Sequence, residues 1–312
     1  MFHLEESQFG PFRRYRFQHD ELGHGFDIVP EVAANVTAIR FSHQNILDGY
    51  TTPEELHAGK WGKSAILFPF PNRLRDGQYT WNGRTYQFPI NNAPTNNAIH
   101  GFVRREVFLV ERVELTREKA AITSRFVADG KNPAYPFPFT LDVTFAMHYA
   151  GQFTASFAVT NHHDESIPVG LGWHPYFQLS EKADEHALQL PPCERVEIDE
   201  RMIPTGKRSP YLDFLDERLL GETQLDTCFA HTSDDSTTRS MLRAKGQTLF
   251  VEAPRKEFPF FQVFTPPARA SIAIEPMTCN VNAFINREGL VEIAPNQRWT
   301  VSFQVSHRFE VE

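Results

Sequence analysis

The chain has 312 residues, of which 41% are hydrophobic and 22% charged, as is ordinary for a globular protein. Its formal net charge of −8 argues against non-specific binding to nucleic acid, which depends on lysine and arginine. No run of about 18 apolar residues occurs, so we expect neither a transmembrane helix nor a membrane partner. The N-terminal segment has acidic residues and no apolar run, so it does not resemble a secretory signal.

The three cysteines are far apart in the sequence, at Cys193, Cys228 and Cys279. No CxxC pair occurs, which disfavours a structural zinc site. A small and odd number of cysteines is more typical of a protein in a reducing compartment than of one held together by disulfides. We therefore expect a cytoplasmic protein.

The first predicted elements are a short helix and a hairpin. Thr52 and Pro53 suit the start of a helix over 52–60. In the hairpin over 77–88, alternating aromatic and β-branched residues flank Asn82-Gly83, a pair that favours a type I′ turn.

Further strands are predicted along the rest of the chain, at 107–115, 120–127, 139–149, 152–160, 247–252, 260–264, 269–274, 290–293 and 298–309. Most of them alternate apolar and polar residues, as antiparallel strands with one solvated face do. A second helix is predicted at 213–221, where Gly221 suits its end, and a polar surface loop at 232–240. Long helices do not alternate with the strands, so we predict an all-β protein, with residues 1–312 in a single domain.

Two of the 13 histidines have surroundings that suggest a site. His174 lies between Trp173 and Pro175 at a predicted strand end, and His100 precedes Gly101 after a turn-rich stretch. Histidines in such positions can face a cleft, although each could equally be a structural residue bonded to the backbone.

Three charged residues have similar surroundings. Glu275 follows an apolar alternating strand, and partial burial there would raise its pKa and make it a better base near neutral pH. Asp226 is an acidic residue in an apolar stretch, and Arg73 could direct its guanidinium to ligand hydroxyls or a phosphate. The alternatives are that Glu275 is a surface glutamate at a turn, that Asp226 forms an Asx-turn and that Arg73 is a surface charge.

Together these residues resemble one family, the aldose 1-epimerases or galactose mutarotases. The resemblance rests on PNRLRDGQYTWNGRTYQF, NNAPTNNAIHGF, GLGWHPYF, LDTCF and IEPMTCNVNAF. Their order and spacing agree with the family pattern from about residue 25 to the C-terminus. The resemblance implies a β-supersandwich of large antiparallel sheets with an open sugar cleft on a concave face.

The resemblance also implies the roles of the site residues. Glu275 corresponds to the catalytic base, His174 to the acid, and His100 to a residue that assists at the ring oxygen. The sugar-contacting positions fall on Arg73 and Asp226, with Asn72 as their neighbour; the match at Asp226 is the loosest.

Mutarotation needs a base for the anomeric hydroxyl and an acid for the ring oxygen, and it needs no cofactor or metal. We therefore expect an ionised Glu275 and a charged His174, with pKa values pushed apart by their environments. The hypothesis places the two histidines on one ring oxygen, with Glu275 opposite them.

Several alternatives stay open. Arg104 and Arg105 follow His100 and would suit a phosphorylated sugar, that is, a hexose-6-phosphate mutarotase, although they could equally be solvated strand charges. A non-catalytic sugar-binding protein could share the fold. Two histidines and a glutamate could form a facial triad for a metal, but no HxH pair is present. We expect a small-molecule sugar as partner and leave a homodimer open.

Overall fold

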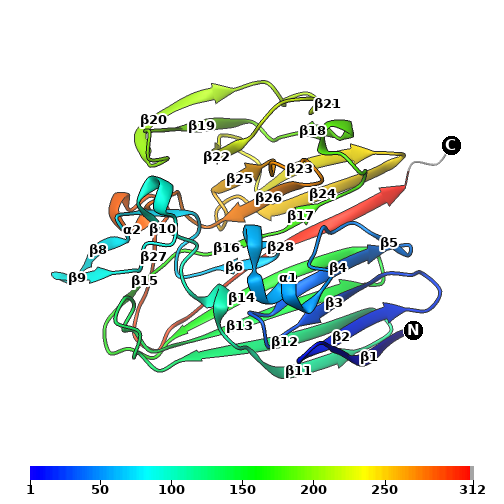
Figure 1. The fold of residues 1–312 in the computed structure, drawn as a ribbon, viewed down its shortest axis with the longest axis horizontal. Coiled ribbons are helices and arrows are strands. Elements are labelled where there is room, and N and C mark those ends of the chain that lie inside the picture. The colour runs from blue at the N-terminus through cyan, green and yellow to red at the C-terminus, as the bar shows by residue number, and fades with distance from the viewer. Residues whose placement is uncertain (310–312) are drawn as a thin grey trace.

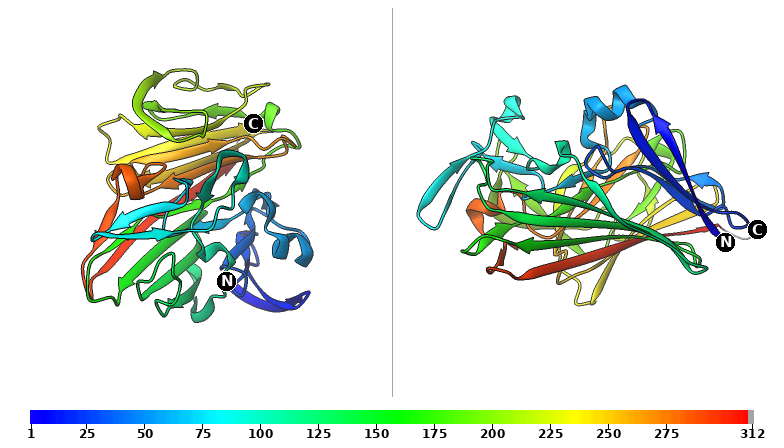
Figure 2. Two further views of the ribbon diagram at one scale, coloured as in Figure 1. Left: turned by 60° about the vertical axis from the view of Figure 1, so that its left-hand side comes forward. Right: turned by 90° about the horizontal axis from the view of Figure 1, so that it is seen from below.

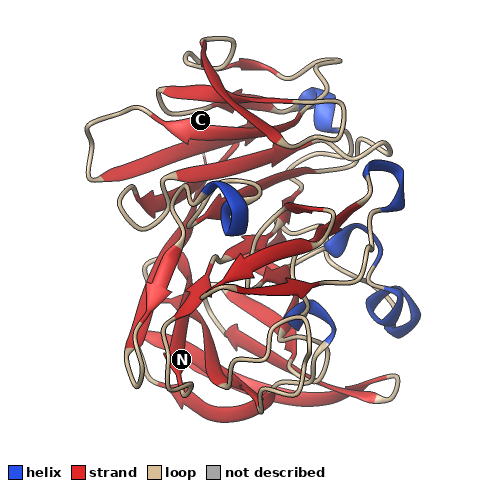
Figure 3. Cartoon of the chain, turned by 90° about the vertical axis from the view of Figure 1, so that its left-hand side faces the viewer, coloured by secondary structure: helices blue, strands red, loops and turns tan. Residues whose placement is uncertain are grey.

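The computed structural model describes residues 1–309, and its architecture is all-β, as the sequence predicts. Strands dominate, and helices occur only as short turns between them (Figure 3). Two large antiparallel sheets form most of the molecule (Figure 1). The alternating strands of the sequence therefore become sheets with one buried face.

The first large sheet has nine strands in the order β11-β12-β13-β14-β28-β24-β23-β18-β21. Their bounds are β11 Leu109–Leu115, β12 Lys119–Ala128, β13 Phe139–His148, β14 Gln152–Asn161, β18 Ala187–Gln189, β21 Arg218–Leu219, β23 Thr237–Ala244, β24 Gln247–Pro254 and β28 Arg298–Phe309. The C-terminal strand β28 lies in the middle of this sheet, between β14 and β24.

The second large sheet has eight strands and carries Glu275, His174 and Asp226 of the candidate site. Its order is β20-β19-β22-β25-β26-β16-β6, and β17 also pairs with β26. Their bounds are β6 Ala65–Leu67, β16 Gly172–His174, β17 Tyr176–Phe177, β19 Cys193–Ile198, β20 Pro204–Tyr211, β22 Asp226–His231, β25 Phe260–Phe264 and β26 Ile272–Met277.

A five-stranded sheet and three strand pairs complete the β-structure. The sheet runs β1 Phe2–Phe9, β2 Phe12–His19, β3 Gly25–Val29, β4 Asn35–Phe41 and β5 Gln44–Asn45. The pairs are β7 Arg73–Arg75 with β10 Asn97–Ile99, β8 Gln78–Trp81 with β9 Arg84–Gln87, and β15 Ile167–Val169 with β27 Val291–Ile293. The β8–β9 hairpin projects at one end of the molecule and the N-terminal strands lie at the other (Figure 2).

Helices are few and short. They are α1 Pro53–Ala58, α2 Ala283–Asn286 and the 3₁₀ turns η1 Lys60–Gly62, η2 Ala93–Thr95, η3 Val103–Arg105 and η4 Ala183–Glu185. None of the helices in residues 1–309 is long and apolar enough to cross a membrane.

Aromatic side chains fill the space between the two large sheets. Trp173 of β16 is fully buried, and its ring centroid lies 5.4 Å from that of Phe145 in β13 and 5.9 Å from that of Phe303 in β28. Aromatic rings bury large apolar areas, so such contacts between sheets stabilise the sandwich strongly. The Trp173 indole N–H also donates to the Ser64 carbonyl at 3.0 Å, which satisfies its one polar group.

The structure confirms several of the predicted elements. The side chain of Thr52 caps α1 by accepting from the Glu55 amide, and Gly59 ends the helix with a φ of 59°. Asn82 and Gly83 both have positive φ, 47° and 74°, as a type I′ hairpin turn requires. Strand β25 has the predicted bounds of 260–264.

Two predicted elements are wrong. The segment 213–221 forms turns and the short strand β21 instead of a helix, because β21 adds to the edge of the nine-stranded sheet beside β18. Leu220 is buried in the core. The predicted loop at 232–240 is too long, because Thr237 begins β23 and pairs with Pro254 of β24.

The N-terminal strands β1–β4, which were not predicted, show how tertiary pairing overrides a weak local pattern.

Candidate active site

The alternation of side chains along β16 and β26 separates the core from the candidate site. In β16, Trp173 points into the core and the next residue, His174, points to the opposite face. In β26, Ile274 belongs to the core, whereas Glu275 lines the pocket. Successive residues of a strand face opposite sides of the sheet. In each of these two pairs, one residue therefore packs in the core and the next is a polar residue that faces the pocket.

Strand register brings further polar groups to the same face. Gln262 of β25 lies opposite Glu275, and Phe264 lies opposite Asp226 of β22. Directly opposite residues on neighbouring strands have their side chains within contact distance. The pocket face of the eight-stranded sheet is thereby built from residues of five strands, β16, β17, β22, β25 and β26.

These side chains line one pocket of about 310 Å³. That volume suits a small ligand such as a monosaccharide. The lining residues are Trp61, Gly62, Asn72, Arg73, Asn91, Asn92, Ile99, His100, Arg104, His174, Tyr176, Asp226, Gln262, Phe264 and Glu275.

His174 and Glu275 form the buried centre of this pocket. His174 Nε2 lies 3.3 Å from Glu275 Oε1, and the two side chains are only 6% and 1% exposed. Neither carboxyl oxygen of Glu275 makes a well-formed hydrogen bond, and His174 Nδ1 has no partner either. Buried polar groups are usually satisfied, so unsatisfied ones that line a pocket indicate that a ligand completes their bonding.

Burial changes the protonation of both groups. It raises the pKa of Glu275 well above its ordinary value, helped by the charge of Asp226 and opposed by that of Arg73. It also lowers the pKa of His174 to about 3. A protonated Glu275 and a neutral His174 are therefore favoured near neutral pH in the protein alone, whereas the sequence led us to expect an ion pair.

His100 is held in one orientation by two backbone contacts. Its amide donates to the Asn72 carbonyl at 2.8 Å, and its ring Nδ1 accepts from the Asn72 amide at 3.2 Å. Burial and the charge of His174 lower the pKa of His100 well below its ordinary value. Because Nδ1 accepts a hydrogen bond, the neutral ring carries its proton on Nε2 and can donate it to a ligand.

The turn that presents His100 depends on Gly101. Both residues have positive φ, 65° and 59°. A Cβ atom on Gly101 would lie 1.9 Å from the Phe68 carbonyl oxygen, so only glycine fits there. The positive φ of His100 is uncommon for a side-chain-bearing residue, and strained residues of this kind cluster at functional sites.

Four polar side chains form a closed network at one wall of the pocket. Arg73 Nη1 donates to Asn72 Oδ1 at 3.0 Å, and Asn72 Nδ2 donates to Gln262 Oε1 at 3.1 Å. Gln262 Nε2 in turn donates to Asp226 Oδ1 at 2.6 Å. Asp226 Oδ2 lies 3.5 Å from Arg73 Nη2, which closes the ring. Such a network fixes the direction of donors and acceptors that a sugar's hydroxyl groups can use.

The two arginines after His100 have different surroundings. Arg105 donates from Nη1 to the His57 carbonyl and from Nη2 to the Ala58 carbonyl, both at 3.0 Å, and so caps the end of α1. Arg104 lines the pocket instead. Neither residue lies in a strand, since both are in η3, but Arg105 is exposed, so the alternative of a solvated charge holds for Arg105.

The structure brings all six residues expected from the sequence to one pocket: Glu275, His174, His100, Arg73, Asn72 and Asp226. One detail of the expectation is wrong, because Glu275 lies within β26 and not beyond its end.

Sequence reasoning missed Gln262 and Trp61. Gln262 lies in a predicted strand without a distinguishing local pattern; its alternation with Phe264 and its register with Glu275 are the signals that identify it. Trp61 is 44% exposed at the pocket, and its φ of 64° interrupts η1. An exposed aromatic ring beside a polar pocket is suited to pack on the apolar face of a sugar ring.

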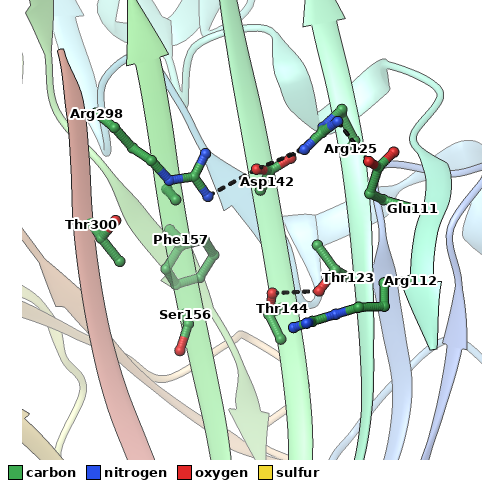
Figure 4. Close-up of a pocket in the computed structure, with 11 residues that line it drawn as sticks. Glu111, Arg112, Thr123, Arg125, Asp142, Thr144, Ser156, Phe157, Arg298 and Thr300 are labelled. Carbon is green, nitrogen blue, oxygen red and sulfur yellow. Dashed lines mark hydrogen bonds and ion pairs between the residues drawn. The ribbon is translucent and has the colours of Figure 1, made fainter. Parts of the chain in front are cut away.

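A second hollow, of about 400 Å³, lies on the nine-stranded sheet, and its two carboxylates, Glu111 and Asp142, are already paired with arginines (Figure 4). Asp142 accepts from Arg125 Nε at 2.6 Å and from Arg298 Nη2 at 2.9 Å. Burial alone would raise the pKa of Asp142, but these hydrogen bonds outweigh it and lower the pKa. With its charges mutually satisfied, this hollow lacks the unpartnered groups that mark the first pocket as the site.

The facial-triad alternative has no geometric support in the part of the chain that the structure describes. Within residues 1–309, no group of three or more His, Cys, Asp or Glu side chains is arranged to hold a metal ion.

Comparison with known proteins agrees with this geometry. Residues 24–306 match the aldose 1-epimerase family. The uncharacterized protein YihR of Escherichia coli is 30% identical over 240 residues, covering 74% of each chain. The galactose mutarotase of Sus scrofa is 28% identical over 152 residues, which cover 47% of this chain and 42% of that protein.

Solved structures share the fold over nearly the whole chain. A galactose mutarotase-like protein from Clostridium acetobutylicum superposes with a TM-score of 0.88 at 20% identity, covering 99% of this chain and 98% of that one. Galactose 1-epimerase from Lactobacillus acidophilus superposes with a TM-score of 0.84 at 14% identity, covering 100% and 99%. Because the family match extends over most of the sequence, this chain belongs to the aldose 1-epimerase family.

Proposed function

We propose that this protein interconverts the α and β anomers of an aldohexose by opening and closing the sugar ring, with residues 1–312 acting as one domain. The observation that carries the proposal is the contact between Glu275 and His174, two buried groups that lack other partners. Both the anomeric oxygen O1 and the ring oxygen O5 are bonded to C1. A base for one and an acid for the other must therefore be neighbours, as these two groups are.

In the proposed reaction, ionised Glu275 removes the O1 proton while the C1–O5 bond breaks and the His174 imidazolium protonates O5. Rotation about C1–C2 then exposes the other face of the aldehyde, and the reverse transfers close the ring. The Nε2–H of His100 donates to the ring oxygen, and the Arg73–Asn72–Gln262–Asp226 network orients the hydroxyls.

The proton count of the pair is the same in its two forms. Protonated Glu275 with neutral His174 holds one proton, and so does ionised Glu275 with charged His174. The form that burial favours in the empty pocket is the form left after ring opening. Binding of the cyclic sugar must then stabilise the ionised form, through its hydroxyls and Arg73.

The first test is polarimetry of freshly dissolved α-D-glucose and α-D-galactose with wild type and with His174→Ala. We expect the wild type to accelerate mutarotation and the variant to lose about 10²–10⁴-fold in kcat/KM, the usual contribution of a positioned acid. Tight sugar binding without acceleration by the wild type would instead identify a sugar-binding protein.

The pH dependence of kcat/KM provides a second test. Below the His174 pKa of about 3 the pair gains a second proton, and above the raised pKa of Glu275 it loses its only one. We therefore expect a profile without an inflection near 6.5, where an ordinary histidine titrates. The uncatalysed rate must be subtracted at each pH. An acid limb centred near 6.5 would contradict the shared-proton assignment.

A further inference from the structure

Arg104 is the one arginine of the pocket that is not paired with an acid. It lies in η3 and is partly buried against the pocket that holds His100 and His174. No described residue forms a hydrogen bond or an ion pair with its guanidinium. The other pocket arginine, Arg73, has Asp226 at 3.5 Å.

Among residues 1–309, no protein group compensates the charge of Arg104. Burial and the neighbouring charge of Arg105 lower the pKa of Arg104, and only Tyr50 acts in the other direction. Burial raises the pKa of Tyr50 to about 12, so that hydroxyl carries no charge at neutral pH. Partial burial removes some of the water around this cation without supplying a partner, a cost that an anionic ligand would offset.

The remaining charges of the pocket do not supply an anion for Arg104. Asp226 is paired with Arg73, Glu275 is protonated in the empty pocket, and both histidines are neutral. In the second hollow, by contrast, Arg125 and Arg298 each have Asp142 as an acidic partner (Figure 4). The substrate pocket thus has an excess of one positive charge.

The position of Arg104 indicates which part of a sugar it would meet. Arg104 follows His100 by only four residues, and it lines two adjoining hollows together with Gly62. A Cβ atom on Gly62 would lie 3.9 Å from the His174 ring, so Arg104 lies on the histidine side of the pocket. In the proposed reaction the histidines serve the ring oxygen O5. In an aldohexopyranose O5 is bonded to C5, which carries C6, so the C6 substituent lies beside the histidines.

We propose that the substrate carries an anionic oxygen group on C6 and that Arg104 binds it. This inference rests on the proposed function, because it uses the ring oxygen to orient the sugar. Phosphate, sulfate and carboxylate groups share the planar or tetrahedral oxygens that a guanidinium binds with two parallel hydrogen bonds. A neutral hexose would leave the charge of Arg104 unpaired.

The test compares D-glucose with D-glucose 6-phosphate, D-glucose 6-sulfate and D-glucuronate. Anomer exchange is measured at equilibrium by NMR magnetisation transfer, with the uncatalysed rate subtracted. We expect kcat/KM for at least one anionic sugar to exceed that for glucose by about tenfold to a hundredfold, as for a hydrogen bond to a charged group. The sugar that gains most identifies the anion. Its KM should rise with added salt, whereas that of glucose should not.

Variants distinguish a role of Arg104 in binding the anionic group from a general loss of activity. Arg104→Gln should lower the ratio of anionic to neutral kcat/KM by about tenfold or more. Arg104→Lys should recover part of that ratio, because it keeps the charge without the fork. Arg105→Gln is the matched control, since Arg105 caps α1, and it should keep the wild-type ratio.

The outcomes that overturn the inference are distinct from those that overturn the proposed function. A wild-type preference for glucose over all three anionic sugars, or an unchanged ratio in Arg104→Gln, overturns the role of Arg104 and leaves the mutarotase assignment intact. Acceleration of none of the four sugars overturns the proposed function, and this inference with it.

Discussion

Replacing Glu275 with glutamine is expected to remove mutarotase activity and, above neutral pH, to make the protein more stable. The activity loss should be about 10²–10⁴-fold in kcat, because an amide cannot accept the anomeric proton. The stability gain follows from burial, since the side chain is 1% exposed and both of its oxygens lack a hydrogen bond. Glutamine has nearly the same shape as glutamate but cannot ionise.

The sign of the stability effect follows from the raised pKa of Glu275. Above its ordinary value of 4.5, the unfolded chain releases the proton that the folded protein keeps, so wild-type stability falls as pH rises towards the folded pKa. The glutamine variant has no such proton to keep, so its stability advantage over the wild type should grow steadily from pH 4 to pH 8.

Urea unfolding at pH 4 and pH 8 measures this difference. The two proteins should differ least at pH 4 and most at pH 8. Glu292→Gln, at an exposed position on β27, is the matched control and should change neither activity nor the pH trend. An inactive variant that is less stable than wild type at pH 8 would mean that Glu275 is ionised in the empty pocket.

Gly101→Ala is expected to be the most destabilising small substitution near the site. The added Cβ would meet the Phe68 carbonyl oxygen at 1.9 Å, and the backbone cannot yield without displacing His100. We expect a loss of more than about 3 kcal/mol in the free energy of unfolding, in the range reserved for severe steric conflict. Thermal and urea unfolding measure it, and polarimetry measures the accompanying loss of activity.

Gly83→Ala separates the steric conflict of the added Cβ from the cost of placing alanine at a positive φ. Gly83 also has a positive φ, 74°, but nothing lies within 4 Å of its added Cβ. Its substitution should cost only the left-handed backbone penalty of about 1–2 kcal/mol. Equal losses in the two variants would show that the close approach to Phe68 has no effect of its own.

Local patterns were sufficient to predict the fold class and several elements. The Asn82-Gly83 hairpin and the capped helix after Thr52 depend on neighbouring residues alone, so they could be found in the sequence. The segment 213–221 has a helix-like end, but its backbone pairs with β18 in the nine-stranded sheet. That pairing joins residues distant in the chain, and no local rule contains it.

Six members of the candidate site and the direction of the Glu275 pKa shift were predictable from the sequence, but the protonation of the Glu275–His174 pair was not. The resemblance selected Glu275 and His174, and the structure places them in contact at 3.3 Å. Their protonation depends on how completely the surrounding sheets exclude water, which single-sequence patterns do not report. Gln262 was missed for a similar reason, because only strand register sets it opposite Glu275.

The alternation along β16 and β26 has a consequence for how this protein could evolve or be redesigned. Trp173 and Ile274 maintain the core, while their neighbours His174 and Glu275 perform the proposed chemistry. A residue that faces the pocket can therefore be replaced while the core-facing residues of the same strand keep their packing. A new sugar preference can be acquired by exchanging alternate residues of these strands, with folding left to the residues between them.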